Sequence, residues 1–399
     1  MPQQPPAPPL WTRFASGQVS EAPSLARVKS GVLHVAWREG GNLLHSTIVA
    51  DGKPATGPAT SVGTSQSTPW LAAAPDGALL QVLFFAQGSL HAATSKDSGA
   101  SWSRAAVNGP QPGANFAIAP DKDGKPVIIS AEKGQLTLLG GAEPQRVQEG
   151  PCCLDRLALA LDVESAEGWA AWYQDTPKAT GLFARAVKPL GSKAQLAPGS
   201  QAAGRTQRLP LTARLGVPGV YLAYLAGPAV AREVKLWNVR GGEALTIAKA
   251  PGARHVWLAP APDGRLWILW MNGNGTVSAV RSNKALLRFS KPYTLGKPSV
   301  DLGGIPFLIA DGAKGPLDVI SGAFHTRLLP TMEVSASPQG IRVADLGEPV
   351  DGVDVEIGGK KITTDLKGLA AYPITAGTPP PPMKATHPAY APTATYTVK

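Results

Sequence analysis

Two acidic side chains, Glu39 and Asp175, stand at the ends of predicted strands, where a pair of carboxylates can act on a sugar. Glycoside hydrolysis uses one carboxylic acid to protonate the leaving oxygen and a second carboxylate to activate water or attack the ring. Tyr173 lies two positions before Asp175, but the sequence shows no glutamate partner for this tyrosine. Glu39 and Asp175 are therefore catalytic candidates by position alone, and no complete catalytic set can be assigned.

The two cysteines of the chain, Cys152 and Cys153, are adjacent. Neighbouring Cα atoms lie about 3.8 Å apart across a trans peptide, so a disulfide between them closes a strained ring. Such a vicinal disulfide would form a rigid apolar knob suited to a ligand platform, in an oxidising compartment. A pair of buried thiols is the alternative, because free cysteine often behaves as a small core residue.

The sequence gives little indication of a metal or cofactor site. The six histidines are dispersed, whereas a structural zinc site requires closely spaced ligands. His45 and His91 occupy equivalent positions in two repeats, which indicates repetition rather than coordination. The segment Asp121-Lys122-Asp123-Gly124 begins like a calcium loop but lacks the late glutamate, so we interpret it as a hairpin turn. We expect no metal and no cofactor.

Composition favours an all-β chain. The 399 residues exceed what one hydrophobic core usually organises, and 44 glycines and 39 prolines suit many short strands joined by tight turns. The formal net charge is +10, but lysines and arginines are scattered rather than clustered, which favours solubility over a nucleic-acid surface. No apolar run is long enough to span a bilayer. We therefore expect neither specific nucleic-acid binding nor a transmembrane segment.

A repeated unit of apolar strands and turns positions these residues. Units begin near Ser24, Thr68, Ala114, Asp155, Arg208, Arg254 and Ser299. The spacing of about 40 to 55 residues is that of a four-stranded propeller blade. Asp-Gly turns, as in Pro75-Asp76-Gly77 and Pro262-Asp263-Gly264, are typical of hairpins. The sequence predicts a β-propeller over residues 11–330, with seven blades, or six if the last unit belongs elsewhere.

One short motif sharpens the fold prediction. Ser95, Asp97, Gly99 and Trp102 match the Asp-box pattern Ser/Thr-x-Asp-x-Gly-x-x-Trp on the turn between the third and fourth strands of the second unit. Over about residues 10–330 the chain resembles bacterial sialidase-like, Asp-box (BNR) repeat propellers, a family of glycosidases and non-catalytic binding proteins. The resemblance implies that the Asp box shapes a turn opposite the binding face. The arginine triad and Tyr/Glu pair of a sialidase cannot be placed, and Trp37-Arg38-Glu39 stands where an Arg-Ile-Pro motif is expected.

Propeller topology predicts a binding face. Strands within a blade alternate in direction, so the loops between second and third strands share a face with the segments that link blades. The predicted ligand-binding residues on this face are Arg38, Glu39, Tyr173, Asp175, Arg254, His255 and Asn272, with Cys152 and Cys153 nearby.

The two ends of the chain differ from the repeats. Residues 1–10 form a Pro-rich segment typical of a tether that follows a signal peptide, which predicts a secreted, periplasmic or cell-surface protein. A cytosolic protein with a disordered Pro-rich arm is the alternative. Residues 331–399 resemble bacterial immunoglobulin-like, carboxypeptidase-regulatory-like domains, through Glu348-Pro349-Val350-Asp351-Gly352-Val353 and a final Ala394-Thr395-Tyr396-Thr397-Val398 strand. Alternating strands and turns also predict a small β-sandwich there. The excess positive charge belongs to the first 330 residues.

Three functions remain open from the sequence. The first is a non-catalytic extracellular or cell-surface recognition or scaffold protein that binds a glycan or protein through the propeller loop face. The second is a divergent, sialidase-like glycoside hydrolase that uses carboxylates on that face. The third is a structural component of a larger surface appendage or assembly. Because the sialidase residues are not identifiable, the sequence favours the first.

Overall fold

The computed structural model describes residues 10–55, 57–74, 76–107, 115–121, 126–132, 134–139, 144–148, 155–176, 179–191, 193–202, 208–298, 307–337, 339–374 and 381–393. These residues form β-strands and three single-turn 3-10 helices, η1 (Ser200–Ala202), η2 (Ala229–Ala231) and η3 (Pro262–Gly264). No helix in these ranges is long and apolar enough to cross a membrane. The all-β prediction is therefore confirmed.

Within the described ranges before Pro330, the strands form seven antiparallel sheets of four. The first three are β2 (Ser24–Arg27), β3 (Leu33–Glu39), β4 (Asn42–Ile48), β5 (Thr60–Thr64); β6 (Trp70–Ala73), β7 (Leu80–Ala86), β8 (Ser89–Ser95), β9 (Ser103–Ala106); and β10 (Asn115–Pro120), β11 (Pro126–Glu132), β12 (Gln135–Leu139), β13 (Gln145–Gln148). The next three are β14 (Asp155–Asp162), β15 (Glu167–Thr176), β16 (Ala179–Lys188), β17 (Gln195–Leu196); β18 (Leu211–Ala213), β19 (Val220–Ala226), β20 (Glu233–Asn238), β21 (Leu245–Lys249); and β22 (His255–Pro260), β23 (Leu266–Met271), β24 (Val277–Arg281), β25 (Tyr293–Thr294). The seventh contains β1 (Thr12–Arg13), β28 (Phe324–Leu328), β27 (Leu317–Ser321) and β26 (Ile309–Asp311).

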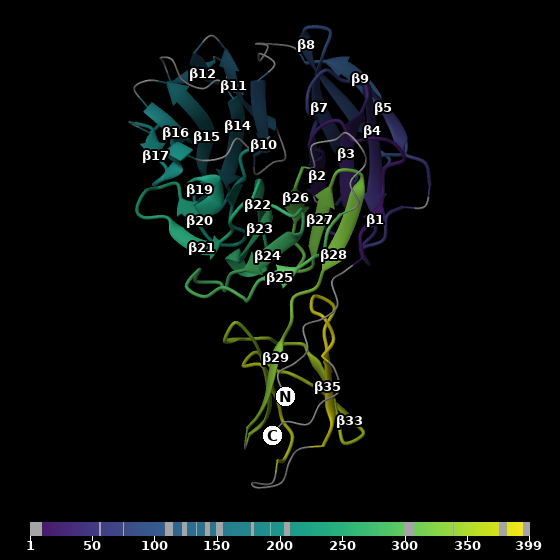
Figure 1. The fold of residues 1–399 in the computed structure, drawn as a ribbon. Helices are drawn as coiled ribbons and strands as arrows, with labels where there is room; N and C mark the ends of the chain where they lie inside the picture. Colours follow the sequence, from purple (N-terminus) through teal and green to yellow (C-terminus); the bar gives the residue numbers. More distant parts are fainter. Residues whose placement is uncertain are drawn as a thin grey trace.

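The sheets are arranged in a ring (Figure 1). The first strand of each sheet, from β2 round to β26, contacts the first strand of the next, and β26 returns to β2. The N-terminal strand β1 pairs with β28 and so completes the seventh sheet with residues from the opposite end of the chain. This arrangement is that of a β-propeller. The number of blades stays a prediction.

A buried charge network joins the first and last sheets. Arg27 of β2 forms ion pairs with Asp311 and Asp318. Asp318 also accepts from His325 at 2.8 Å and from Arg327 at 2.9 Å and 2.8 Å. Because Asp318 is fully buried, these partners replace the water that its charge loses. The network fixes the junction at which the ring closes.

The sheets pack on one another face to face, which explains their apolar composition. All six residues of β23, Leu-Trp-Ile-Leu-Trp-Met, are buried, because both faces of this strand meet a neighbouring sheet. Asp263 and Gly264, with φ of 59° and 74°, form the turn that joins β22 to β23. The hairpin predicted at Pro262-Asp263-Gly264 is therefore confirmed.

A smaller β-sandwich follows the propeller, below it in Figure 1. One sheet contains β29 (Glu333–Ser337), β30 (Gly340–Asp345), β31 (Glu348–Pro349) and β34 (Leu369–Ala370). The other contains β33 (Lys360–Thr363), β32 (Asp354–Ile357) and β35 (Met383–Thr386). Alternate residues of β30 and β32, such as Val343 and Val355, are fully buried in a core between the two sheets. The sandwich prediction is confirmed.

The sandwich contacts the propeller through buried charges. Arg281 of β24 forms an ion pair with Asp345, and Tyr390 donates to the same carboxylate at 3.0 Å. Arg265 pairs with Glu348, which also accepts from the backbone N–H of Lys284 at 2.9 Å. Both arginine side chains are only 5% exposed. The two parts of the chain are therefore joined by directional, desolvated contacts.

Several predicted features lie outside the described residues. They are most of the N-terminal Pro-rich segment, the cysteine pair Cys152 and Cys153, the turn residues Lys122, Asp123 and Gly124, and the terminal strand 394–398.

Candidate functional site

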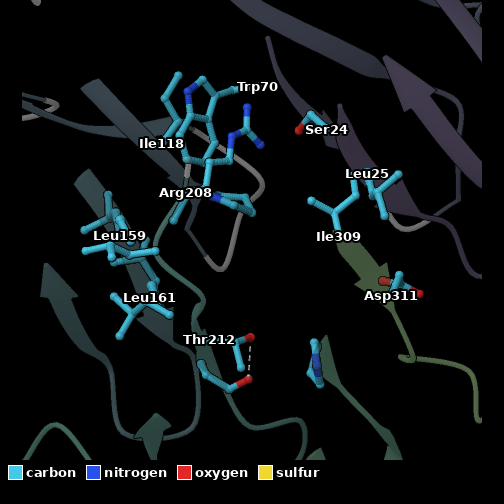
Figure 2. Close-up of a pocket in the computed structure, with 18 of the residues that line it drawn as sticks. Ser24, Leu25, Trp70, Ile118, Leu159, Leu161, Arg208, Thr212, Ile309 and Asp311 are labelled. Atoms are coloured by element: carbon cyan, nitrogen blue, oxygen red, sulfur yellow. Dashed lines mark hydrogen bonds between the residues drawn. The ribbon is translucent and has the colours of Figure 1, made fainter. Parts of the chain in front are cut away.

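The first strands of the seven sheets surround a central cavity. Its volume is 460 Å³, and every first strand of the ring contributes to its wall. Most of the side chains that Figure 2 labels there are aliphatic or aromatic: Leu25, Trp70, Ile118, Leu159, Leu161 and Ile309. The labelled polar residues are Ser24, Thr212, Asp311 and Arg208. We call this cavity the central channel.

The start of each first strand and the turn between second and third strands lie together at one end of the ring. In the first sheet, the backbone N–H of Gly40, in the β3–β4 turn, donates to Ser20 at 3.1 Å, just before β2. Arg38 of β3 forms an ion pair with Glu21 at 2.8 Å. Strand alternation brings these segments together, and we call this end the loop face.

Arg208 is held at the loop-face end of the channel. It donates to the carbonyl of Pro69 at 2.6 Å and to that of Pro23 at 3.3 Å, so it connects three sheets. Its guanidinium carbon lies 4.3 Å from the centroid of the Trp70 ring, in cation–π geometry. Burial lowers the pKa of Arg208 to about 9, although the charge of Glu21 acts in the opposite direction. The site therefore contains a cation in surroundings that disfavour its charge.

A second cavity of 120 Å³ adjoins Arg208 and Trp70 on the loop face. It combines hydroxyl, amide, guanidinium and aromatic groups, from Ser67, Thr68, Trp70, Asn115, Phe116, Arg156, Leu157 and Arg208. Thr68 donates to Glu21 at 2.7 Å, and the Ser67 hydroxyl accepts from the backbone N–H of Phe85 at 3.0 Å. These bonds orient the hydroxyl groups. We call this cavity the polar pocket.

A third cavity of 10 Å³, with room for about one water molecule, lies between Arg208 and His255. Burial lowers the pKa of His255, and the nearby charge of Arg254 adds to the effect. This imidazole is therefore neutral near neutral pH. His255, alone among the predicted loop-face residues that the structure describes, lines one of these three cavities.

The other predicted residues take part mainly in local contacts. Asn272 accepts from Trp270 at 2.9 Å and donates to Ser278 at 2.9 Å, which fixes its own turn. Tyr173 is buried in β15, where it belongs to a core cluster. The backbone N–H of Arg254 donates to the carbonyl of Met271 at 3.0 Å.

The two candidate catalytic carboxylates stand on different sheets. Glu39 ends β3 of the first sheet and lies against Gly17 and Trp37. Asp175 belongs to β15, three places round the ring, and accepts from Thr180 at 3.3 Å. Neither residue lines the central channel or the polar pocket. The structure therefore does not bring them together around either cavity.

The turn from Ser95 to Trp102 has an internally bonded geometry. Asp97 accepts from the backbone N–H of Ser101 at 2.9 Å and from the Ser95 hydroxyl at 2.7 Å. Gly99 has φ of 91°, and Trp102 donates to its carbonyl at 3.2 Å. Hydrogen bonds from Ser101 and then Ser95 lower the pKa of Asp97 to about 2. The turn connects β8 to β9 and is not part of the cavity walls described above.

Sequence reasoning missed Trp70 and Arg208 as site residues. The sequence places Arg208 only at the start of a repeat, yet residues at repeat starts reach the loop face of a propeller. The useful signal was therefore position within the repeat rather than residue type. Among the described residues, no group of three His, Cys, Asp or Glu side chains is placed to hold a metal ion.

Fold and site together define a β-propeller protein with an apolar central channel and a polar pocket at one end. No protein-family model and no curated protein matches the chain. Several solved structures match the chain. An ulvan lyase, a polysaccharide lyase bound to -[GlcA(1-4)Rha3S]-, matches with a TM-score of 0.50 and 11% identity, over 79% of this chain and 94% of the lyase.

Two further matches have lower TM-scores. The SapL1 lectin in complex with alpha methyl fucoside has a TM-score of 0.44 and 12% identity, over 72% of this chain and 99% of the lectin. The RRP9 WD40 repeats have a TM-score of 0.48 and 12% identity, over 80% of this chain and 93% of that one. At these identities the likeness concerns the fold.

Proposed function

We propose that this chain is a non-catalytic recognition protein that binds a glycan at the loop face of its propeller. The polar pocket carries the proposal. Hydroxyl and amide groups there can pair with sugar hydroxyls, and the faces of Trp70 and Phe116 can cover the apolar face of a sugar ring. The structurally similar ulvan lyase is bound to an oligosaccharide, so carbohydrate is the first ligand class to test.

The arginines favour an acidic glycan. Arg156 and Arg208 both line the polar pocket, and guanidinium groups bind carboxylates and sulfates through charged hydrogen bonds. Residues before Pro330 also carry the whole positive excess of the chain. A uronate or a sulfated sugar would therefore bind more tightly than its neutral counterpart.

The absence of catalysis rests on position. Glu39 and Asp175 lie away from the two larger cavities, so the residues that would perform glycoside hydrolysis are not placed across a bound sugar there. In this proposal the chain is a sialidase-like, Asp-box propeller that has kept the binding face. A secreted, periplasmic or cell-surface location fits such a role. The immunoglobulin-like sandwich would position the propeller through the Arg281–Asp345 contact.

The test is a glycan array probed with the full chain, with neutral, uronate-bearing and sulfated members. We expect binding to acidic members, and loss of that binding in Asn115→Ala and Arg156→Met. Arg104→Met is the matched control, because Arg104 is exposed on the outer strand β9. If no glycan binds, or if Asn115→Ala and Arg156→Met bind as the unaltered chain does, the polar pocket is not a glycan site.

Turnover of sialoside and other glycoside reporters is measured on the same samples. Turnover that Glu39→Gln or Asp175→Asn abolishes would replace the recognition proposal with the hydrolase alternative. Binding of a protein instead of any glycan would assign the loop face to a scaffold or to a component of a larger assembly.

A further inference from the structure

We propose that the central channel binds a second class of ligand, a monocarboxylate with an unbranched apolar chain. The apolar chain of the ligand lies along the first strands of the sheets, and its carboxylate lies beside Arg208. This site goes beyond the proposed glycan function, since it uses a different cavity and a different ligand chemistry.

The size and lining of the channel fit an alkyl chain. Its volume of 460 Å³ lies within the range of roughly 300–1,000 Å³ typical of small-molecule sites. Leucine and isoleucine side chains from several sheets form much of the wall (Figure 2). A sugar placed there would leave its hydroxyl groups without hydrogen-bond partners, which costs free energy. A hydrocarbon chain has no polar groups to satisfy, and its transfer from water to an apolar cavity is favourable.

Arg208 provides one charged end of the channel. The carbonyls of Pro23 and Pro69 and the ring of Trp70 fix the position of its guanidinium. Such a preorganised cation binds a carboxylate without first having to be ordered. The lowered pKa of Arg208 is consistent with this, because an anion nearby would offset the cost of its desolvated charge.

The acidic group whose charge acts on Arg208 is already engaged. Glu21, which attracts Arg208, pairs with Arg38 at 2.8 Å and accepts from Thr68 at 2.7 Å. Its negative charge is therefore shared with a second arginine and a hydroxyl. A ligand carboxylate at Arg208 would therefore be repelled less strongly by Glu21.

The opposite end of the channel sets the orientation of the ligand. Asp121, which follows β10, and Asp311, which ends β26, contribute to the wall there. Asp311 pairs with Arg27, so that end presents no excess of positive charge to a ligand. The described lining of the channel contains no lysine or arginine other than Arg208, so a second carboxylate would find no cation there. The ligand is therefore a monocarboxylate, with its head at Arg208 and its chain directed towards Asp311.

The test is isothermal titration calorimetry of the full chain with octanoate, 1-octanol and acetate. We expect octanoate to bind more tightly than the other two, because acetate lacks the chain and octanol lacks the charge. Across a series from butanoate to dodecanoate, affinity should rise about fourfold per methylene until the channel is full. Equal affinity for octanoate and octanol, no gain with chain length, or no binding of octanoate would each overturn the proposal.

Variants locate the site. Arg208→Met should weaken the binding of octanoate by about thirtyfold, as expected for loss of a buried charged partner. Arg104→Met should leave the affinity for octanoate unchanged. Thr212→Trp fills the channel with a large side chain and should abolish octanoate binding. Circular dichroism and thermal melting establish that each variant is folded. If Thr212→Trp does not fold, the series from butanoate to dodecanoate still tests the proposal. Unchanged octanoate binding in folded Arg208→Met would place the ligand elsewhere.

The same variants separate this proposal from the glycan proposal. Asn115→Ala should affect acidic glycans and not octanoate, because Asn115 lines the polar pocket and not the channel. Thr212→Trp should have the opposite effect. Failure of one ligand class therefore leaves the other proposal standing.

Discussion

The guanidinium carbon of Arg208 lies 4.3 Å from the centroid of the Trp70 ring. The two residues stand at the starts of different sheets, so the contact forms only when the ring closes. The pair borders both the central channel and the polar pocket. It therefore links the stability of the propeller to the site that we assign to ligands.

Removing the Trp70 ring should destabilise the propeller as well as weaken binding. We expect Trp70→Leu to lower the free energy of unfolding by about 2 kcal/mol, since a half-buried ring and a cation–π contact are both lost. Urea titration followed by circular dichroism measures this. A double-mutant cycle with Arg208→Met should give a coupling of about 1 kcal/mol. Additive effects of the two changes would show that the contact contributes no energy.

The buried carboxylate at the ring junction should matter more than an exposed one. Burial alone would raise the pKa of Asp318, but bonds from His325 and Arg327 and the charge of Arg27 hold it well below its usual range. Asp318→Asn removes the carboxylate that Arg27 and Arg327 share and leaves Arg27 with Asp311 alone, so it should cost about 3–5 kcal/mol in urea unfolding. Asp51→Asn, in an exposed pair with Lys53, is the control and should change little. Similar losses in both variants would argue against the junction as the cause.

Acid should destabilise the first sheet through a histidine pair. Nδ1 of His34 lies 3.1 Å from Nε2 of His45, and burial lowers the pKa of both, that of His45 to about 4. The unfolded chain therefore binds more protons than the folded one between pH 6.5 and about 4, so stability falls as the pH decreases through this window. For His45 the loss is on the order of 3 kcal/mol. His45→Gln should flatten the curve of unfolding free energy against pH, and an unchanged curve would contradict this.

The contact between Arg281 and Asp345 should fix the sandwich on the propeller. Asp345→Asn removes the charge that compensates Arg281 and weakens the bond from Tyr390. We expect a larger radius of gyration in small-angle X-ray scattering and faster proteolysis between residues 328 and 333. Lys284→Ala, which breaks a half-exposed pair with Asp263, is the control. An unchanged scattering profile in Asp345→Asn would mean that the remaining contacts hold the sandwich.

The repeat starts show how much of the fold could be predicted from the sequence. Predicted starts at Ser24, Asp155 and Arg254 agree within one residue with strands β2, β14 and β22. Strand patterning and turn residues are local properties, so they can be read without the ring. The last predicted start, Ser299, lies ten residues before β26, which begins at Ile309.

The site could not be predicted in the same way. Hydrophobic alternation and turn chemistry are encoded locally, so the all-β class, the repeated strand units and the small sandwich could be predicted from the sequence, whereas the pairing of β1 with β28 could not. Only the tertiary structure placed Arg208 over Trp70 and arranged the first strands around a central channel. Ring closure decides which side chains converge, and this depends on contacts between residues far apart in the chain. For the same physical reason only the structure shows that neither Glu39 nor Asp175 lines the central channel or the polar pocket.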